Sequence, residues 1–211
     1  MRDSQGTLID LAGWKRREHF QLFRNSAQPF FSVTLDVDVT SLWRRSLDDP
    51  DMSFAVSALF LLLRATNASE PLRLRVRGES VWRHHSVGVG TTVLRSDETF
   101  GFARLDLTPA YEDFRKAAQA TIESAKHPGA LEPTDNDDVV YHSTLPWLRF
   151  TSFTNALSRM DSIPRIVFGK VSAEGAAYRM PMAVEVHHAL VDGLDVARFV
   201  EDFQSEVARF A

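Results

Sequence analysis

Near the end of the chain, two adjacent histidines are followed by an aspartate and a glycine, in a pattern that suits acid–base chemistry. His187 and His188 stand where an apolar run stops, and Asp192 and Gly193 stand where an amphipathic pattern begins. A neutral imidazole, whose ordinary pKa is about 6.5, can act as a general base near pH 7. A carboxylate in the next turn can pair with a buried arginine, and a glycine lets the backbone turn tightly. The spacing therefore predicts a base at a strand end, held in place by an acidic residue.

The two histidines are not expected to share a metal ion. Adjacent residues on a strand point to opposite faces, so one ring can enter a cleft while the other packs. We therefore predict a general base and no metal site. A second pair, His84-His85, has no Asp–Gly after it and is predicted to lie on the surface of a hairpin.

Hydrophobic periodicity predicts the elements that would position this motif. Apolar and polar residues alternate over 31–39, which is typical of a half-buried strand. Thr40 is expected to cap a helix over 41–47, and Ser53 a helix to about residue 68 that is apolar on nearly every side and therefore central. Residues 8–12 are predicted to form a short strand or an extended arm. The other predicted strands cover 73–77, 80–85, 86–94, 100–107, 139–153, 165–172 and 177–188, and the other helices 14–23, 108–126 and 192–210. Mixed strands and helices without a linker predict one layered α/β domain over residues 1–211.

Composition narrows the class of protein further. Hydrophobic residues make up 44% of the chain, enough for a sizeable core, and the net charge of −4 gives no general attraction for nucleic acid. There is no cysteine, which fits a reducing compartment. The charged start of the chain is unlike a signal peptide, and the longest apolar stretch is far below the ~20 residues that span a bilayer. We therefore expect a cytoplasmic protein without nucleic-acid or membrane partners.

Several motifs, in order along the chain, resemble those of chloramphenicol acetyltransferases of the trimeric type. That family belongs to a wider set of CoA-dependent acyltransferases marked by His-His-x-x-x-Asp-Gly, which here covers 187–193. The other matching segments are Trp14–Phe20 (WKRREHF), Glu98–Phe100 (ETF), Ser143–Trp147 (STLPW), Thr151–Phe153 (TSF) and Met180-Pro181. The resemblance implies a two-layer sandwich, a mixed sheet with helices on one face, and a homotrimer with active sites between subunits.

The resemblance also implies roles for single residues. His188 matches the family's general base, which takes the proton of an acceptor hydroxyl as its oxygen attacks the thioester of acetyl-CoA. Ser143 matches the serine that donates a hydrogen bond to the resulting oxyanion. Asp192 matches a structural acid and Arg16 its buried partner, with Arg17 as the neighbouring alternative. Breaking one partner of a fully buried ion pair typically costs about 3–5 kcal/mol.

Residues that bind the two substrates follow from the same comparison. Phe23, Phe30 and Phe100 match aromatic residues of the acceptor pocket or their neighbours. Trp147 and Lys170 match contacts to the CoA arm and its phosphates, where an anion needs a cation. Acetyl-CoA is thus the expected co-substrate, and an acceptor bearing a hydroxyl group is the expected partner.

The chain departs from the family pattern mainly around the acceptor. Phe23 replaces a tyrosine, Val167 a threonine that helps to bind the intermediate, and Val171 another tyrosine. Ser53 stands where a lysine is expected, which removes one phosphate contact. Chloramphenicol is therefore the leading acceptor, and an acyltransferase for another small alcohol, amine or acyl-CoA is the alternative. A trimer that binds ligands without catalysis is a second alternative, and the core of a dihydrolipoyl acyltransferase a third, although a lipoyl domain and linker would be expected with it.

Overall fold

The computed structural model describes residues 5–127, 129, 131, 136–156 and 161–210. Their main sheet has seven strands, six of them in the order β2-β10-β8-β7-β5-β6, with β9 paired to β10. The strands are β2 (Phe30–Asp38), β5 (Gly88–Leu94), β6 (Phe100–Leu105), β7 (Val139–Thr144), β8 (Arg165–Phe168), β9 (Ser172–Glu174) and β10 (Ala177–His187). The pairs β5–β7 and β7–β8 are parallel and the others antiparallel, so the sheet is mixed, as expected.

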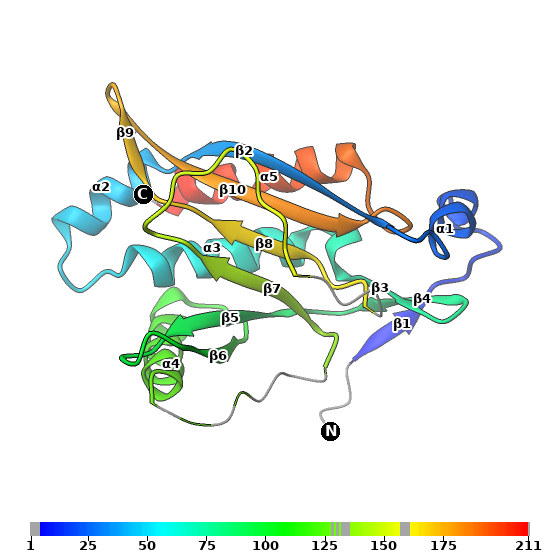
Figure 1. The fold of residues 1–211 in the computed structure, drawn as a ribbon, viewed down its shortest axis with the longest axis horizontal. Coiled ribbons are helices and arrows are strands. Elements are labelled where there is room, and N and C mark those ends of the chain that lie inside the picture. Colours follow the sequence, from blue (N-terminus) through cyan, green and yellow to red (C-terminus); the bar gives the residue numbers. More distant parts are fainter. Residues whose placement is uncertain (1–4, 128, 130, 132–135, 157–160, 211) are drawn as a thin grey trace.

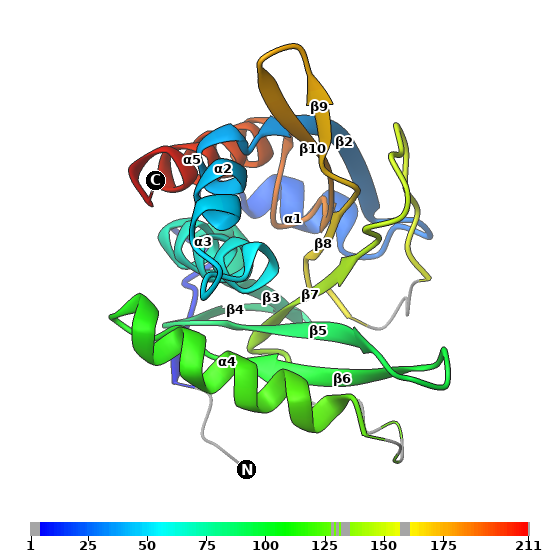
Figure 2. The ribbon, with the colours of Figure 1, turned by 90° about the vertical axis from the view of Figure 1, so that its left-hand side faces the viewer.

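Helices cover one face of this sheet. Figure 2 shows α2 (Thr40–Asp48), α3 (Phe54–Ala68), α4 (Tyr111–Ala125) and α5 (Gly193–Phe210) on one side, while residues 145–156 cross the other side. The short helix α1 (Arg17–Phe23) lies beyond the ends of β2 and β10 (Figure 1). A small second sheet joins β1 (Gly6–Leu8), β4 (Ser80–His84) and β3 (Leu74–Arg77), which follows the 3-10 turn Pro71–Arg73. The layered α/β prediction is confirmed.

Helix α3 forms the centre of the helical layer and packs against α2, α4 and α5. Nearly all of its side chains from Val56 to Ala65 are buried, which explains its apolar character on every side. Ser53 caps it, because the Ser53 hydroxyl accepts a hydrogen bond from the Val56 N–H at 3.4 Å. Helix α5 instead buries a single stripe of apolar side chains: Val196, Phe199, Val200, Phe203 and Val207.

Some expected boundaries are wrong. The strand expected over 139–153 ends at Thr144, because the chain turns at Leu145, whose carbonyl accepts from the Leu148 N–H. The strand expected over 165–172 is divided into β8 and β9 at Gly169, where an added Cβ would lie 2.9 Å from the Phe150 ring. The first strand is Gly6–Leu8 instead of 8–12, and α1 begins only at Arg17.

Two local predictions are also corrected. Thr40 does not cap α2: its hydroxyl accepts from the Tyr178 N–H, while the Asp38 carboxylate accepts from the Thr40 N–H at 2.9 Å. His84 is not at a hairpin surface but is fully buried, with Nε2 3.0 Å from the Asp137 carboxylate. No helix within the described residues is long and apolar enough to span a bilayer.

Candidate active site

The double histidine lies at the end of β10, in a tight turn that leads into α5. His187 is the last residue of the strand, and its carbonyl accepts hydrogen bonds from the N–H groups of Leu190 and Val191. The His188 N–H donates to the Pro29 carbonyl at 2.7 Å, which ties the turn to the start of β2. The turn is therefore fixed on both sides before α5 begins at Gly193.

The His188 ring is held in one orientation. Its Nδ1 lies 3.1 Å from the Val191 carbonyl oxygen, and a carbonyl can only accept, so Nδ1 carries the proton in the neutral ring. Phe23 stacks on the ring at 4.2 Å, and Phe31 packs against it at 4.8 Å. Nε2 therefore keeps the lone pair, and the half-buried ring is arranged to accept a proton there.

Arg16 and Asp192 brace this turn. Arg16 Nη1 lies 2.5 Å from Asp192 Oδ2, and Arg16 Nη2 donates to the His188 carbonyl at 3.2 Å. Arg17, the alternative partner, is exposed. Burial would raise the pKa of Asp192, but the hydrogen bonds from Arg16 and from the start of α5 outweigh it and leave this pKa below its usual range. Because the Asp192 side chain is 39% exposed, breaking the pair should cost less than the 3–5 kcal/mol expected for full burial.

His187 faces the opposite side of the sheet end and has a different environment. It is 5% exposed, the edge of its ring meets Phe30 at 5.2 Å, and its Nδ1 accepts from the Ala189 N–H at 3.3 Å. Burial lowers the pKa of His187 to about 4, although the charge of Asp161 acts in the other direction. His187 is therefore neutral near pH 7, and its role is to pack.

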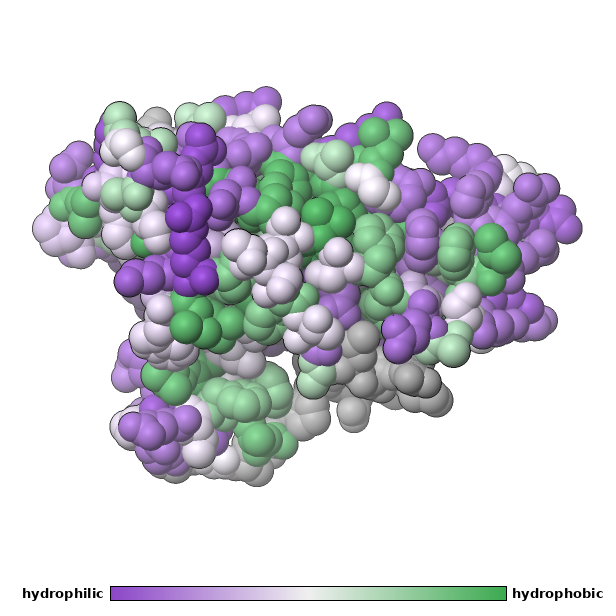
Figure 3. All heavy atoms as spheres, turned by 45° about the horizontal axis from the view of Figure 1, so that its top comes forward, coloured by the Kyte–Doolittle hydropathy of each residue, from purple (hydrophilic) through white to green (hydrophobic). Residues whose placement is uncertain are grey.

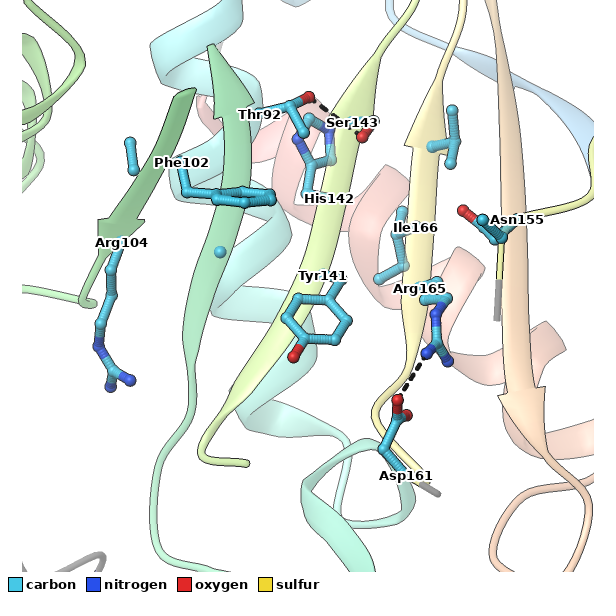
Figure 4. Close-up of a pocket in the computed structure, with 14 residues that line it drawn as sticks. Thr92, Phe102, Arg104, Tyr141, His142, Ser143, Asn155, Asp161, Arg165 and Ile166 are labelled. Atoms are coloured by element: carbon cyan, nitrogen blue, oxygen red, sulfur yellow. Dashed lines mark hydrogen bonds and ion pairs between the residues drawn. The ribbon is translucent and has the colours of Figure 1, made fainter. Parts of the chain in front are cut away.

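A cavity of about 460 Å³ lies on the helix-free face of the sheet, over β5, β6, β7 and β8 (Figure 4). Ser143 lines it from β7, and the Thr92 hydroxyl donates to the Ser143 oxygen at 3.1 Å. Because that oxygen accepts from Thr92, its own O–H remains available as a donor. Val167 stands beside Ser143 on β8 and offers no second hydroxyl.

The other end of the cavity contains a charged pair. Arg165 is 5% exposed, and its Nη2 lies 2.8 Å from the Asp161 carboxylate. Its guanidinium also lies over the Phe30 and Tyr141 rings, at 5.2 and 5.6 Å from their centroids. Of the expected acceptor residues, Phe23 contacts His188, Phe30 contacts Arg165, and Phe100 is 44% exposed; none of them lines the cavity.

Sequence reasoning missed the polar and aromatic side chains that form these walls: Thr92, Phe102, Tyr141, Asn155, Asp161 and Arg165. For Phe102 a signal existed, since it alternates with Phe100 along a predicted strand, and the two rings meet at 5.4 Å. For the others, the pairing order of the strands was needed. Nothing in the spacing of Arg165 indicates which neighbours it meets.

Trp147 and Lys170 lie together beyond the Ser143 end of β7. The Leu145 N–H donates to the Phe168 carbonyl and the Lys170 N–H to the Leu148 carbonyl, both at 2.8 Å, so two short segments run side by side there. Trp147 is 61% exposed, Lys170 is also exposed, and among the described residues no carboxylate pairs with Lys170. The two side chains could therefore contact an anionic ligand that passes Ser143.

One chain does not bring His188 and Ser143 together. Ser143 pairs with Val167 across β7–β8, and Val167 pairs with Ala183 across β8–β10. His188 stands five residues beyond Ala183, which is about 16 Å along the strand, and two strand spacings add about 10 Å across it. The two residues are thus roughly 19 Å apart within one chain, too far to act on one acyl group. No cluster of His, Cys, Asp and Glu suited to a metal ion occurs in the described ranges.

Comparison with known proteins finds relatives that share one description. The family model described as chloramphenicol acetyltransferase matches residues 5–204. The chain is 32% identical over 203 residues to chloramphenicol acetyltransferase 3 from Escherichia coli, covering 94% of this chain and 95% of that protein. It is 29% identical to chloramphenicol acetyltransferase 2 from Haemophilus influenzae, over 94% and 95% of the two chains.

Solved structures show the same fold. A chloramphenicol acetyltransferase superposes with a TM-score of 0.89 at 23% identity, covering 96% of this chain and all of that one. A probable dihydrolipoamide acetyltransferase from Listeria monocytogenes has a TM-score of 0.70 at 10% identity, over 92% and 90% of the two chains. The two-layer acyltransferase architecture expected from the motifs is therefore confirmed.

Proposed function

The chain belongs to the chloramphenicol acetyltransferase family and is an acyltransferase, and from this premise we propose that it moves the acetyl group of acetyl-CoA directly to a hydroxyl of chloramphenicol. The observation that carries the proposal is the orientation of His188, whose Nδ1–H is bound to the Val191 carbonyl while Nε2 keeps its lone pair. A ring held in this way is ready to take a proton from an acceptor without first rotating.

The proposed reaction has one addition and one elimination. Nε2 of His188 takes the proton of the acceptor hydroxyl while the hydroxyl oxygen bonds to the thioester carbonyl carbon. The carbonyl π electrons move to its oxygen, and the Ser143 hydroxyl donates a hydrogen bond to that oxyanion. When the carbonyl re-forms, the carbon–sulfur bond breaks and the thiolate receives the proton from His188. No acyl-enzyme forms, and Asp192 braces the turn with Arg16 without moving a proton.

Trp147 and Lys170 are proposed to receive the arm and a phosphate of acetyl-CoA. Their place beyond Ser143 allows the thioester to reach the cavity while the charged end of the molecule stays near solvent. The exposed ammonium of Lys170, which no described carboxylate neutralises, is the group best suited to a phosphate.

We further propose a homotrimer in which each active site joins two copies of the single 1–211 domain. The separation of roughly 19 Å between His188 and Ser143 supports this, since a neighbouring chain must supply one of them. Hydrophobic residues also gather on the helix-free side and the β2 edge, between more hydrophilic ends (Figure 3). The large exposed side chains near the cavity are Leu94, Phe100, Phe102, Trp147 and Leu148. Burial of such side chains between subunits would stabilise the assembly.

The test is release of CoA thiol from acetyl-CoA in the presence of chloramphenicol, with the O-acetylated product identified by mass. The wild-type protein is expected to turn over, and His188→Ala should lose about 10²–10⁴-fold in kcat. His127→Ala, which removes an exposed imidazole at the end of α4, is the matched control and should retain activity. Full turnover by His188→Ala would disprove the mechanism, while acetyl-CoA binding without turnover of any acceptor would favour a ligand-binding trimer.

A further inference from the structure

We propose that Arg165 determines acceptor specificity, and that the preferred acceptor carries a neutral group that accepts hydrogen bonds at the end remote from the acetylated hydroxyl. The inference rests on the proposed function, because that function places the acceptor in the cavity beside Ser143. It goes further in naming the chemistry of the other end of the acceptor, where Arg165, Asp161 and Tyr141 line the cavity.

The guanidinium of Arg165 has more N–H donors than the hydrogen bonds it makes to Asp161 and Ile163. Nη2 pairs with the Asp161 carboxylate at 2.8 Å, and Nη1 donates to the Ile163 carbonyl at 3.0 Å. A guanidinium has five N–H groups, so within the described part of the chain these two bonds leave several donors for a ligand or water. An apolar group seated against them would remove water without replacing its hydrogen bonds, which is unfavourable.

The plane of this guanidinium is also fixed. It lies over the Phe30 ring from β2 and over the Tyr141 ring from β7, while Asp161 holds one corner. Figure 4 shows Arg165 beside Tyr141 on the same side of the sheet, with the ion pair to Asp161 below them. A donor that is held in place by aromatic contacts recognises a particular geometry in its ligand, unlike a mobile surface arginine.

The charges around Arg165 favour a neutral ligand. Asp161 neutralises the guanidinium directly, and the buried Glu185 stands opposite Arg165 across β8–β10, with its carboxylate bound to the Asn155 side chain at 2.8 Å. A carboxylate on the ligand would therefore be repelled by Asp161, which lines the cavity, and at longer range by Glu185, which does not. An ammonium on the ligand has no lone pair with which to accept the hydrogen bonds that Arg165 offers. An amide carbonyl, a hydroxyl or a similar neutral group meets neither penalty.

The position of Arg165 matches the size of a small acceptor. Arg165 pairs with Tyr141, and Ser143 is two residues further along β7. One strand spacing and two residues of rise place the two Cα atoms about 8 Å apart. A molecule with its reacting hydroxyl near Ser143 and a polar group at a comparable distance would reach both ends of the cavity.

The experiment compares two aryl alcohols that differ only in the substituent para to the group that carries the hydroxyl. One compound has a carboxamide there, and the other has an isopropyl group of similar size. Their affinities for the wild-type protein are measured by calorimetry in the presence of CoA, and kcat/KM by thiol release. The carboxamide is expected to bind and react at least about tenfold better, and Arg165→Met should remove or reverse this ratio. Arg165→Lys, which keeps the charge without the planar fork, should give an intermediate ratio.

The matched control is Arg104→Met. Arg104 lines the same cavity, but its guanidinium is occupied by the carboxylates of Asp106 and Asp138, so the carboxamide-to-isopropyl ratio should not change. Asp161→Asn adds a second test: removing the counter-charge should improve binding of the para-carboxylate alcohol relative to wild type. Circular dichroism and melting temperature establish that each variant is folded.

The outcomes separate this inference from the proposed function. An equal affinity of wild type for the two alcohols, or a ratio that Arg165→Met and Arg165→Lys both leave unchanged, overturns the specificity role even if chloramphenicol is acetylated. If no alcohol and no chloramphenicol is acetylated, the proposed function fails, and the binding ratio still decides the role of Arg165. A wild-type preference for the carboxamide that is lost in Arg165→Met supports it in either case.

Discussion

The turn that carries His188 and the cavity wall that carries Ser143 are held in different ways. In the turn, the ring of His188 is bound to a carbonyl three residues later, Phe23 and Phe31 pack on it, and Arg16 binds the His188 carbonyl from outside. In the wall, Ser143 is supported by Thr92 from another strand, and Arg165 is in contact with rings from two further strands. The hydrogen bonds that shape the turn itself, from His187 to Leu190 and Val191 and from His188 to Val191, are thus local, whereas the wall is assembled from distant parts of the chain.

This difference explains which parts resemble the family most. A local turn needs a short set of residues at fixed spacing, and His187, His188, Asp192 and Gly193 supply it. A wall built from one side chain per strand can change its chemistry position by position without disturbing the fold. Val167 stands where the resemblance led us to expect a threonine, and Arg165 places a charge in the same cavity. The chemistry of acyl transfer can therefore persist while the acceptor changes.

The largest predicted effect is on kcat, when a variant that lacks His188 is combined with a variant that lacks Ser143. The His188→Ala variant alone should lose about 10²–10⁴-fold in kcat, and the Ser143→Ala variant alone about 10²–10³-fold. When both variants are expressed together with different tags and mixed trimers are isolated, some interfaces should join an intact His188 to an intact Ser143. Activity should then recover to a sizeable fraction of wild type.

Recovery is expected because the two residues are roughly 19 Å apart within one chain. If both groups acted within a single chain, every chain in the mixed sample would lack one of them and activity would stay at the level of the single variants. The control mixes two preparations of His188→Ala with different tags, in which no interface has an intact base. Recovery in that control would contradict the role of His188.

The sequence predicts local structure better than it predicts structure assembled from distant parts of the chain. The alternation over 31–39, the cap at Ser53 and the apolar stripe of α5 are local signals, and the corresponding elements are confirmed. The end of β7 was misjudged because the apolar residues Leu145, Trp147 and Leu148 continue the pattern although the latter two are exposed, while Pro146, which cannot donate to a strand ladder, was the signal that the strand stops. Apolar character alone does not separate a buried strand from a hydrophobic surface.

The candidate site shows the same limit. The pairing of Arg16 with Asp192 depends on residues far apart in the chain, and only the family pattern indicated it. The walls of the cavity needed the strand order β8-β7-β5-β6, which places Arg165, Tyr141 and Phe102 on one face. His85 is exposed as predicted, but His84 was misjudged because hairpin position does not reveal that Asp137 arrives from another segment to meet it.

The next prediction separates the two adjacent histidines by pH. Burial lowers the pKa of His187 to about 4, whereas an unfolded histidine has a pKa of about 6.5. Between these values the unfolded chain binds more protons than the folded one. The contribution of neutral His187 to the free energy of unfolding is therefore fully present above about pH 6.5 and is lost as the pH falls towards 4. The lost contribution is about 3 kcal/mol. His187→Gln should reduce this pH dependence by a comparable amount, measured by urea unfolding at fixed protein concentration.

His127→Gln is the control for that measurement, because it removes an exposed imidazole and should leave the pH dependence of unfolding as in wild type. The activity of His187→Gln at pH 7 should remain well above that of His188→Ala, since the proposed proton transfer uses Nε2 of His188 only. An equal loss of kcat in both variants would show that the two histidines act as one unit. An unchanged pH dependence of unfolding would show that His187 does not remain neutral in the fold.

The smallest predicted effect concerns the brace of the turn. Asp192→Asn removes the charge facing Arg16 but can keep the hydrogen bonds from the N–H groups of Leu194 and Asp195, and Arg16 still reaches the His188 carbonyl. Because the Asp192 side chain is 39% exposed, the loss in the free energy of unfolding should be about 1 kcal/mol or less. The loss in kcat should be about tenfold, because the orientation of the His188 ring becomes less well fixed.

Asp195→Asn is the matched control, since Asp195 lies on the same turn but 3.8 Å from Arg16, and its effect on kcat should be smaller. The pKa of Asp192 is lowered in the folded protein, so its contribution to stability is present above about pH 3.8 and is lost as the pH falls below that value. Wild type and Asp192→Asn should therefore differ in unfolding at pH 7 and converge in strong acid. A change in KM for chloramphenicol with kcat unchanged would show that Asp192 acts on the acceptor and not through His188.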